Sequence, residues 1–255
     1  MTQAGPILEV CGVSKSFGHF RAVEEMNLSL ERGSVHALIG PNGAGKSTFL
    51  HLVAGTFAPT AGEIRFRGRN IAGRPPHRIV MAGIARSFQI TSIFPGLTAF
   101  ENVQIALLAR RGRCRNPVAP ARGLLRDDVC ALLGYVRMLD RMQRPAGELA
   151  AGDRKRLEFA MALAGEPELM LLDEPTAGMS PDERAIVVEI IRAINRERGV
   201  TVLFTEHDID MVFTIAGKIT VMHQGAKLTE GLPQAVRADP RVREVYLGES
   251  GDARL

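Results

Sequence analysis

A glycine-rich stretch at residues 40–48 has the residue types and spacing of a phosphate-binding loop. It reads G-P-N-G-A-G-K-S-T and fits the pattern G-x-x-x-x-G-K-[ST]. Glycines let the backbone curl so that successive N–H groups point at one anion. Lys46 offers a cation to the β- and γ-phosphates of a nucleotide, and the Ser47 hydroxyl offers a ligand to Mg²⁺. The residues expected to bind nucleotide here are Gly40, Pro41, Asn42, Gly43, Ala44, Gly45, Lys46, Ser47 and Thr48.

The residues on either side of this loop have the pattern that a phosphate site requires. Residues 35–39 are mostly apolar and predict a buried strand leading into the loop. Residues 49–54 predict a helix leading out of it, with Gly55 at the C-terminal end. The helix N-terminus adds the positive end of its dipole beside a bound phosphate. An ordinary glycine-rich turn is the alternative, and it would not need these flanks.

Two carboxylates follow a second apolar run, at residues 168–173. In an open α/β sheet, ligands collect at the carboxyl ends of the strands, where Asp173 and Glu174 would lie. Asp173 is expected to hold Mg²⁺, directly or through water. Glu174 is expected to polarise the water that attacks the γ-phosphorus. Without the phosphate loop, the pair would be read as two surface carboxylates.

Two further polar residues end predicted strands at the same edge of the sheet. His207 follows the apolar run 200–205, where it could hydrogen-bond the γ-phosphate. Gln89 closes the predicted strand 84–88, where it could bind Mg²⁺ or position water. A lone histidine or glutamine at a strand end is more often an ordinary surface residue, so both assignments depend on the phosphate loop.

The pattern of elements predicts an α/β fold with a P-loop NTPase core. Residues 7–13, 14–23 and 27–30 read as short strands of an N-terminal antiparallel β edge, with a turn and second strand within 14–23. Further along, buried strands alternate with helices, which implies a mixed or parallel sheet covered on both faces. Residues 180–183 (S-P-D-E) form a capping box with proline at the first helical position.

A helical subdomain is expected as an insertion in this core. Residues 100–109 and 124–139 both carry helical spacing, and the stretch between them is rich in Pro, Gly and Arg, which is typical of an exposed loop. We therefore expect one domain over 1–255. Its core would be 1–88 and 164–231, its helical subdomain 89–163, and its C-terminal tail 232–255.

Composition narrows the possible partners. The chain has 255 residues, a formal net charge of +4 and scattered basic residues, which gives little reason to expect nucleic-acid binding. Its three cysteines have no C-x-x-C pair, which argues against zinc and suits a reducing compartment. The sequence shows no signal pattern and no apolar run near the roughly 20 residues needed to span a bilayer. We expect a soluble chain that another chain holds at any membrane where it works.

Taken in order, these motifs resemble the ATP-binding-cassette (ABC) ATPases along essentially the whole chain. The resemblance implies that residues 40–48 are the phosphate loop, Gln89 the Q-loop, Glu174 the catalytic glutamate and His207 the switch histidine. Residues 177–181 fall at the D-loop. Phe17 falls where an aromatic residue stacks on adenine, although packing in the core is the alternative. ATP and Mg²⁺ are the implied cofactors.

The signature motif of this family, usually L-S-G-G-Q, is altered in this chain. It reads Leu149-Ala150-Ala151-Gly152-Asp153, without the serine hydroxyl and one glycine. The resemblance implies that Ala150, Ala151 and Gly152 cover the ATP of a partner cassette. The N–H groups at the start of the following helix can still meet an anion. Asp153 would repel a nearby phosphate, so we expect its side chain to point away.

The altered signature resembles the L-A-x-G form of ATPase subunits in branched-chain amino acid importers and their urea or amide relatives. Residues 84–89, 93–98 and 245–249 also resemble that subfamily. A lipopolysaccharide-export type shares the tail ending and is the second choice. Non-transport cassettes that act on DNA or ribosomes are a further alternative. The cassettes that act on DNA need a long coiled coil between the phosphate loop and the signature, and this sequence has no sustained heptads there. The cassettes that act on ribosomes usually carry two cassettes in one chain, whereas this chain has one.

The resemblance also implies partners and a location. A second ABC ATPase subunit would complete the site, with a heterodimer favoured and a homodimer open. Transmembrane permease subunits would hold the chain peripherally at the cytoplasmic face of the inner membrane, with a binding protein acting indirectly and no nucleic acid. The apolar residues after Gln89 would either receive a permease helix or fill the subdomain core; they are Ile90, Ile93, Phe94, Leu97 and Phe100.

Overall fold

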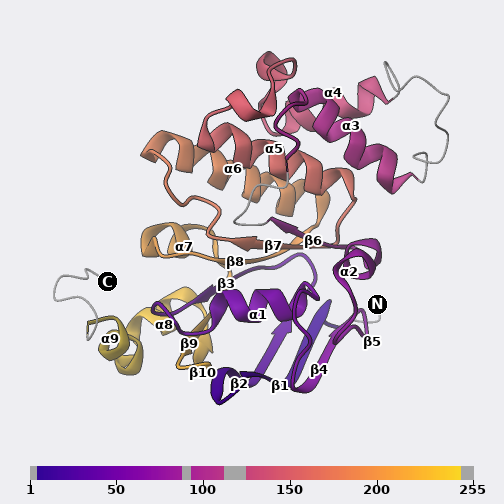
Figure 1. Cartoon of the computed structure of the whole chain (residues 1–255). Helices are drawn as coiled ribbons and strands as arrows, with labels where there is room; N and C mark the ends of the chain where they lie inside the picture. Colours follow the sequence, from indigo (N-terminus) through magenta and orange to yellow (C-terminus); the bar gives the residue numbers. More distant parts are fainter. Residues whose placement is uncertain (1–4, 88–92, 112–124, 248–255) are drawn as a thin grey trace.

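The computed structural model shows two β-sheets and a set of helices packed around them (Figure 1). It describes residues 5–87, 93–111 and 125–247. A helical layer containing α3, α4, α5 and α6 covers one face of the larger sheet, while α1 lies on the other face (Figure 1). Among the described residues, no helix has the length and apolar character needed to cross a bilayer.

The N-terminal strands form an antiparallel sheet of their own. Its order is β2 (Phe20–Leu30), β1 (Leu8–Phe17), β4 (Ala61–Phe66) and β5 (Arg69–Asn70). The turn expected within residues 14–23 falls at residues 18–19, so the first strand is longer than expected: β1 continues to Phe17 and pairs there with Phe20. The pairing register shifts between Val10 and Val13, and Gly12 has a φ of 58° there, so a bulge lets the strand continue.

The larger sheet holds the strands whose ends carry the predicted chemistry. Its order is β10-β9-β3-β8-β7-β6. Neighbours from β9 through β6 run parallel, and β10 is antiparallel to β9. The strands are β3 (Val35–Ile39), β6 (Ile84–Ser87), β7 (Leu169–Asp173), β8 (Thr201–Thr205), β9 (Lys218–His223) and β10 (Ala226–Gly231). The predicted mixed sheet is confirmed.

Alternate residues of the central strands face two different apolar cores. On β7, Met170 and Leu172 pack with the helical layer, whereas Leu169 and Leu171 pack with α1 and the N-terminal sheet. Both faces of the sheet are therefore covered, which is why these strands read as continuous apolar runs in the sequence. The two cores place α1 and α5 on opposite faces of the sheet.

The helices follow the predicted order with one clear difference in length. They are α1 (Lys46–Val53), α2 (Pro76–Ala82), α3 (Ala99–Arg110), α4 (Arg126–Tyr135), α5 (Ala151–Ala164), α6 (Pro181–Arg198), α7 (Ile209–Ile215), α8 (Pro233–Ala238) and α9 (Pro240–Leu247). The expected helix 124–139 is shorter because Leu125 and Arg137 both adopt positive φ, 59° in each case. Left-handed residues cannot continue a right-handed helix, so α4 ends before Arg137.

Candidate functional site

The phosphate loop lies between β3 and α1, as the sequence predicts. Lys46 begins α1 and is buried, and its Nζ donates to the carbonyl oxygens of Gly40 at 2.6 Å and Pro41 at 2.9 Å. Its cation is therefore held inside the curve of the loop. The exposed residues Asn42 and Gly43 form the outer edge of the loop.

Two loop glycines stand where a side chain would strike backbone. A Cβ on Gly40 would lie 2.1 Å from the carbonyl oxygen of Met222, and one on Gly45 would lie 2.3 Å from that of Ala22. Gly225, in the turn between β9 and β10, donates its N–H to Ala44 at 3.1 Å and accepts from Glu24. The loop is thus supported by backbone from β2 and from the β9–β10 hairpin.

Asp173, at the end of β7, is buried and faces the first turn of α1. Its Oδ1 accepts from the Thr205 hydroxyl at 2.7 Å and from the Ser47 hydroxyl at 3.4 Å. Its Oδ2 lies 3.4 Å from Nη2 of Arg86. A hydroxyl and a carboxylate oxygen side by side are hard oxygen donors of the kind that Mg²⁺ prefers, so this pair fits the predicted metal.

Glu174 follows Asp173 in a strained backbone conformation. Its φ is 47°, a region that non-glycine residues rarely occupy, and its N–H donates to the Thr205 carbonyl at 3.1 Å. Strain of this kind concentrates at functional sites. The Glu174 carboxylate lies 2.8 Å from Nε2 of His207, so the structure brings together two residues that are 33 positions apart in the sequence.

A buried carboxylate fixes the segments that carry this pair. Glu206 is 4% exposed, and its Oε1 accepts from the backbone N–H of Thr176 at 2.9 Å and from the Thr176 hydroxyl at 2.5 Å. Its Oε2 accepts from the N–H of His207 at 3.1 Å. The chain after Glu174 and the chain before His207 are therefore joined through one side chain.

Phe17, the residue predicted to stack on adenine, is exposed, with 44% of its surface accessible. Its ring meets Phe57 edge-on, with centroids 5.3 Å apart, and Nζ of Lys15 lies 5.0 Å from the Phe17 centroid. Phe57 in turn stacks on His51 at 5.0 Å. Core packing therefore does not account for Phe17, whose accessible ring leaves a π-face for a base.

The altered signature begins α5 on the opposite face of the sheet from α1. Ala150 is the N-cap of α5 and makes no side-chain cap, so the first N–H groups lack that partner. A Cβ on Gly152 would lie 2.7 Å from Oε1 of Glu183. Asp153 is buried and paired with Arg141 and Arg156. The expectation that its side chain points away from a phosphate at the helix start agrees with this pairing.

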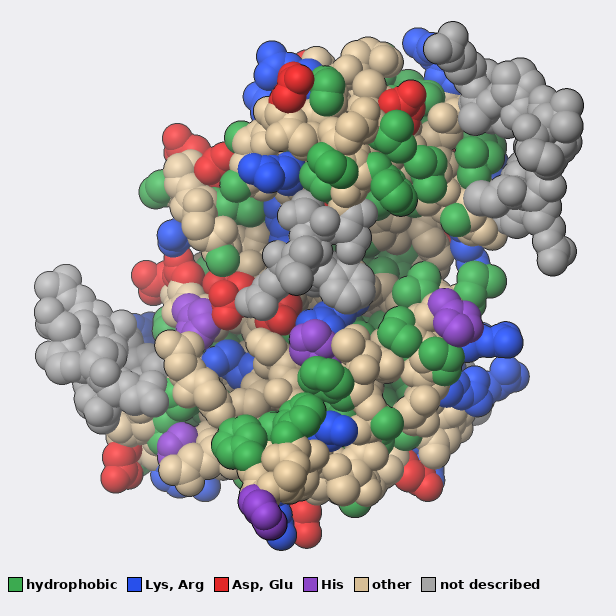
Figure 2. Space-filling model, in the orientation of Figure 1, with side chains coloured by type: hydrophobic (Ala, Val, Ile, Leu, Met, Phe, Trp, Pro, Cys, Tyr) green, Lys and Arg blue, Asp and Glu red, His purple; other side chains and the backbone are tan. Residues whose placement is uncertain are grey.

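The structure gathers most of the predicted residues and adds several that sequence reasoning missed. Figure 2 shows acidic, basic and histidine side chains gathered across the middle of one face, between the helical layer and the β-rich lower part. Gln89 and Ile90 lie outside the described residues. The missed residues near Asp173 are Arg86, Thr205 and His51. Two of them had a usable signal: His51 lies four residues after Ser47 and so on the same face of α1, and Thr205 ends the apolar run 200–205.

A phosphate loop between the buried strand β3 and the helix α1, with the carboxylates of Asp173 and Glu174 at the end of β7 in the same sheet, defines a P-loop nucleoside triphosphatase. The family model described as "ABC transporter" matches residues 23–177. A second model, described as "Branched-chain amino acid ATP-binding cassette transporter", matches residues 226–252.

Individual proteins agree with these matches. The chain is 38% identical over 254 residues to a high-affinity branched-chain amino acid transport ATP-binding protein, BraF, from Pseudomonas aeruginosa, covering 96% of this chain and 99% of that one. It is 35% identical over 252 residues to LivG from Escherichia coli (strain K12), with 96% and 99% coverage. The structure of MJ1267, an ATP-binding cassette of an ABC transporter in its ADP conformation, superposes with a TM-score of 0.85 at 28% identity, covering 95% of this chain and 99% of that one.

The chain belongs to the ABC transporter family, and within it to the ATP-binding cassettes that hydrolyse ATP.

Proposed function

We propose that this chain is the ATPase subunit of an importer for branched-chain amino acids or related small polar solutes such as urea and amides. The observation that carries this proposal is the branched-chain family match at residues 226–252, since it adds to the cassette match a region outside the nucleotide motifs. The names of BraF and LivG support the same substrate class. No such observation favours a lipopolysaccharide exporter or an ATPase acting on DNA or ribosomes.

Within the nucleotide site, each residue has a distinct role. Backbone N–H groups of the loop 40–48, Pro41 excepted, bind the phosphates, Lys46 neutralises the β- and γ-phosphates, and Phe17 stacks on the adenine. Ser47 and Asp173, together with Gln89, would hold Mg²⁺, and the metal would neutralise phosphate charge when bound.

Glu174 and His207 carry out the proton chemistry at the γ-phosphate. Glu174 orients the attacking water and accepts its proton. His207, whose Nε2 is 2.8 Å from the Glu174 carboxylate, holds that carboxylate in place and hydrogen-bonds the γ-phosphate. The buried Glu206–Thr176 contacts keep the two residues at this spacing. Water activation thus depends on the Glu174–His207 pair and on the contacts that hold it.

A second cassette completes the site in this proposal. Ala150, Ala151 and Gly152 cover the ATP of the partner, because the uncapped start of α5 presents N–H groups and a positive dipole end there. The lost serine hydroxyl makes this contribution weaker than usual. A heterodimer is favoured, since a partner with a regular signature would complete this chain's own site.

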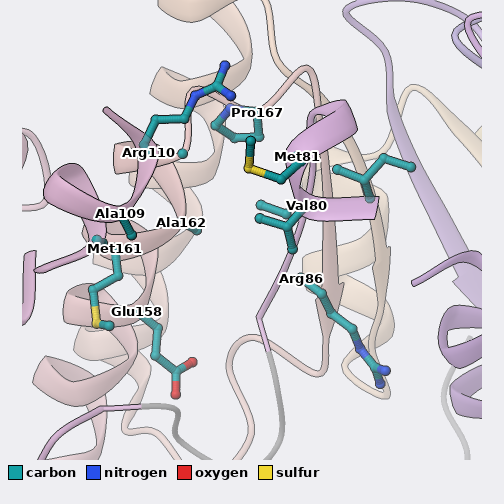
Figure 3. Close-up of a pocket in the computed structure, with 13 residues that line it drawn as sticks. Val80, Met81, Arg86, Ala109, Arg110, Glu158, Met161, Ala162 and Pro167 are labelled. Carbon is teal, nitrogen blue, oxygen red and sulfur yellow. The ribbon is translucent and has the colours of Figure 1, made fainter. Parts of the chain in front are cut away.

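An apolar groove is the surface to which the permease would bind. It measures about 320 Å³ and is lined by α2, β6, α3 and α5, with Val80 half exposed and Met81 60% exposed (Figure 3). Phe94, in the segment expected to receive a permease helix, is 49% exposed, whereas Ile93 and Phe100 pack against the core. We place the chain peripherally at the cytoplasmic face of the inner membrane, and the binding protein acts only through the permease.

The test is uptake by the assembled transporter with Glu174→Gln in this chain. The amide keeps the size of the side chain but cannot accept the proton, so ATP should remain trapped and uptake of a labelled branched-chain amino acid should stop. Glu189→Gln, on the exposed side of α6, is the matched control and should transport normally. Full uptake with Glu174→Gln would overturn the catalytic assignment. Uptake of no branched-chain amino acid, urea or amide by the unaltered transporter would overturn the substrate class.

A further inference from the structure

Arg86 makes a buried ion pair with the carboxylate that the proposed function assigns to Mg²⁺. The Arg86 side chain is 5% exposed and that of Asp173 is 1% exposed, with Nη2 and Oδ2 3.4 Å apart. Burial lowers the pKa of Arg86, while Asp173 acts against that shift. A buried charge is stable only with a compensating partner, so each of these groups depends on the other.

The two oxygens of Asp173 have separate partners. Oδ2 meets Arg86, whereas Oδ1 meets the hydroxyls of Ser47 and Thr205. The guanidinium therefore lies on the side away from Ser47. By holding Oδ2, the guanidinium leaves Oδ1 directed at the Ser47 hydroxyl, which would bind the same Mg²⁺ ion.

Arg86 has a second contact that fixes its own position. Its Nη1 donates to Nδ1 of His51 at 2.8 Å. An accepting Nδ1 requires a neutral imidazole. Burial, followed by the charge of Arg86, lowers the pKa of His51, which agrees with that state. His51 lies one turn after Ser47 on α1, so one guanidinium joins β6, β7 and the helix of the phosphate loop.

We propose that Arg86 is a positioning residue for the magnesium–nucleotide site. It anchors on His51 and orients the Asp173 carboxylate so that Oδ1 faces Ser47 before nucleotide and metal arrive. This inference rests on the proposed assignment of Ser47 and Asp173 to Mg²⁺. Partners of this kind, one step removed from a metal, commonly change metal affinity by 10–100-fold when they are removed.

The same residue borders the apolar groove. Arg86 is one of its lining residues, and Figure 3 shows the side chain extending away from Arg110 and Met81, which lie at the other end of the groove. A movement of β6 caused by an occupant of the groove would therefore move a direct partner of Asp173.

The experiment measures the Mg²⁺ concentration that gives half of the metal-dependent gain in binding of a fluorescent ATP analogue to the purified chain. Arg86→Met removes the guanidinium and should raise this concentration roughly tenfold. Binding measured in a chelator should stay unchanged, because the phosphate loop keeps Lys46. Arg86→Lys keeps a charge but cannot reach both Asp173 and His51, so its Mg²⁺ requirement should lie between those of the unaltered chain and Arg86→Met. An unchanged Mg²⁺ requirement with Arg86→Met would overturn the inference.

His51 supplies a second pair of variants in case Arg86→Met does not fold. His51→Phe keeps a ring against Phe57 and removes the acceptor, so it should raise the Mg²⁺ requirement by a few-fold. His51→Asn keeps an acceptor near the position of Nδ1 and should restore the original value. Equal values for both would overturn the inference.

Asp173→Asn separates this inference from the proposed function. It should abolish the metal-dependent gain in nucleotide binding. If it does so while the Arg86 and His51 variants change nothing, the positioning role is wrong and the metal assignment stands. If Asp173→Asn leaves the gain intact, the metal assignment is wrong and the inference falls with it.

Discussion

The phosphate loop and the start of α5 both offer backbone N–H groups to a phosphate, but they are built differently. The loop is enclosed by backbone of β2 and the β9–β10 hairpin, with Lys46 buried inside it. The start of α5 has no side-chain cap, and the carboxylate in its first turn, Asp153, is paired with Arg141 and Arg156. In the proposed function, the loop therefore gives this chain's own nucleotide Lys46 and backbone N–H groups, whereas the start of α5 gives a partner's nucleotide mainly helix N–H groups.

The largest expected effect comes from removing the cation of the loop. Lys46→Met should weaken ATP binding to the isolated chain roughly a hundredfold, close to 3 kcal/mol, because hydrogen bonds to charged groups are worth about 1.5–3 kcal/mol each. Lys155→Met, which removes a lysine from the signature half, is the matched control and should leave binding unchanged. Equilibrium titration with an ATP analogue checks both. Equal losses would break the contrast between the two regions.

The folding stability of the chain should decrease in acid because of a buried histidine on β3, the strand that leads into the phosphate loop. His36 on β3 is 1% exposed, and its Nε2 lies 2.8 Å from the Thr220 hydroxyl. Burial lowers its pKa from 6.5 to about 4; Glu230 opposes this shift, and Lys218 and Lys227 reinforce it.

Below pH 6.5 the unfolded chain binds a proton at His36, whereas the folded chain binds it only near pH 4. The free energy of unfolding therefore falls as the pH drops from 6.5 to about 4. The loss reaches about 3 kcal/mol at about 1.4 kcal/mol per pKa unit. His36→Gln should flatten this part of the unfolding free energy against pH, while exposed His77→Gln should not. A curve unchanged by His36→Gln would show that other groups cause the acid sensitivity.

A smaller effect is expected at Asp153. Asp153→Asn leaves Arg141 and Arg156 without their carboxylate and should lower the unfolding free energy by about 2 kcal/mol. Asp140→Asn, at an exposed site that also meets Arg141, should change it by less than about 0.5 kcal/mol. Denaturant titration compares them. A gain in ATP affinity of the assembled dimer with Asp153→Asn would show instead that this carboxylate faces the partner's phosphate.

The smallest effect tests the missing cap directly. Ala150→Ser supplies an N-cap hydroxyl to α5 and should stabilise the chain by about 1 kcal/mol. For a chain of this size that is a rise in Tm of about 2–4 °C. Ala151→Ser places the hydroxyl one position later, inside the helix, and should give no such gain. Equal Tm values for the two variants would mean that α5 already has its N–H groups satisfied.

Much of the candidate nucleotide site could be predicted from the sequence because its residues lie at the ends of apolar runs. Asp173, Glu174 and His207 each follow a strand, and parallel strands bring their carboxyl ends to one edge. Arg86 was not predictable in this way. Its partner Asp173 is 87 residues away in the sequence, and their contact depends on β6 pairing with β7.

The limits of α4 and β1 were missed for local reasons. Periodicity extends the helix past Tyr135 because apolar residues continue, yet the backbone turns at Arg137. Similarly, the polar residues after Val13 suggest a turn, yet cross-strand pairing carries β1 on to Phe17. Cross-strand pairing thus overrides the local pattern in β1, whereas a left-handed residue ends the helix in α4.

The backbone support of the phosphate loop has a consequence for the thermodynamics of nucleotide binding. A loop packed against the backbone of Met222, Ala22 and Gly225 has little conformational freedom, so little conformational entropy should be lost when ATP binds. The free energy released at the phosphates then remains available to bring two cassettes together. ATP bound in the loop can in this way favour the contact between two cassettes, although ATP does not touch that contact surface in the free subunit.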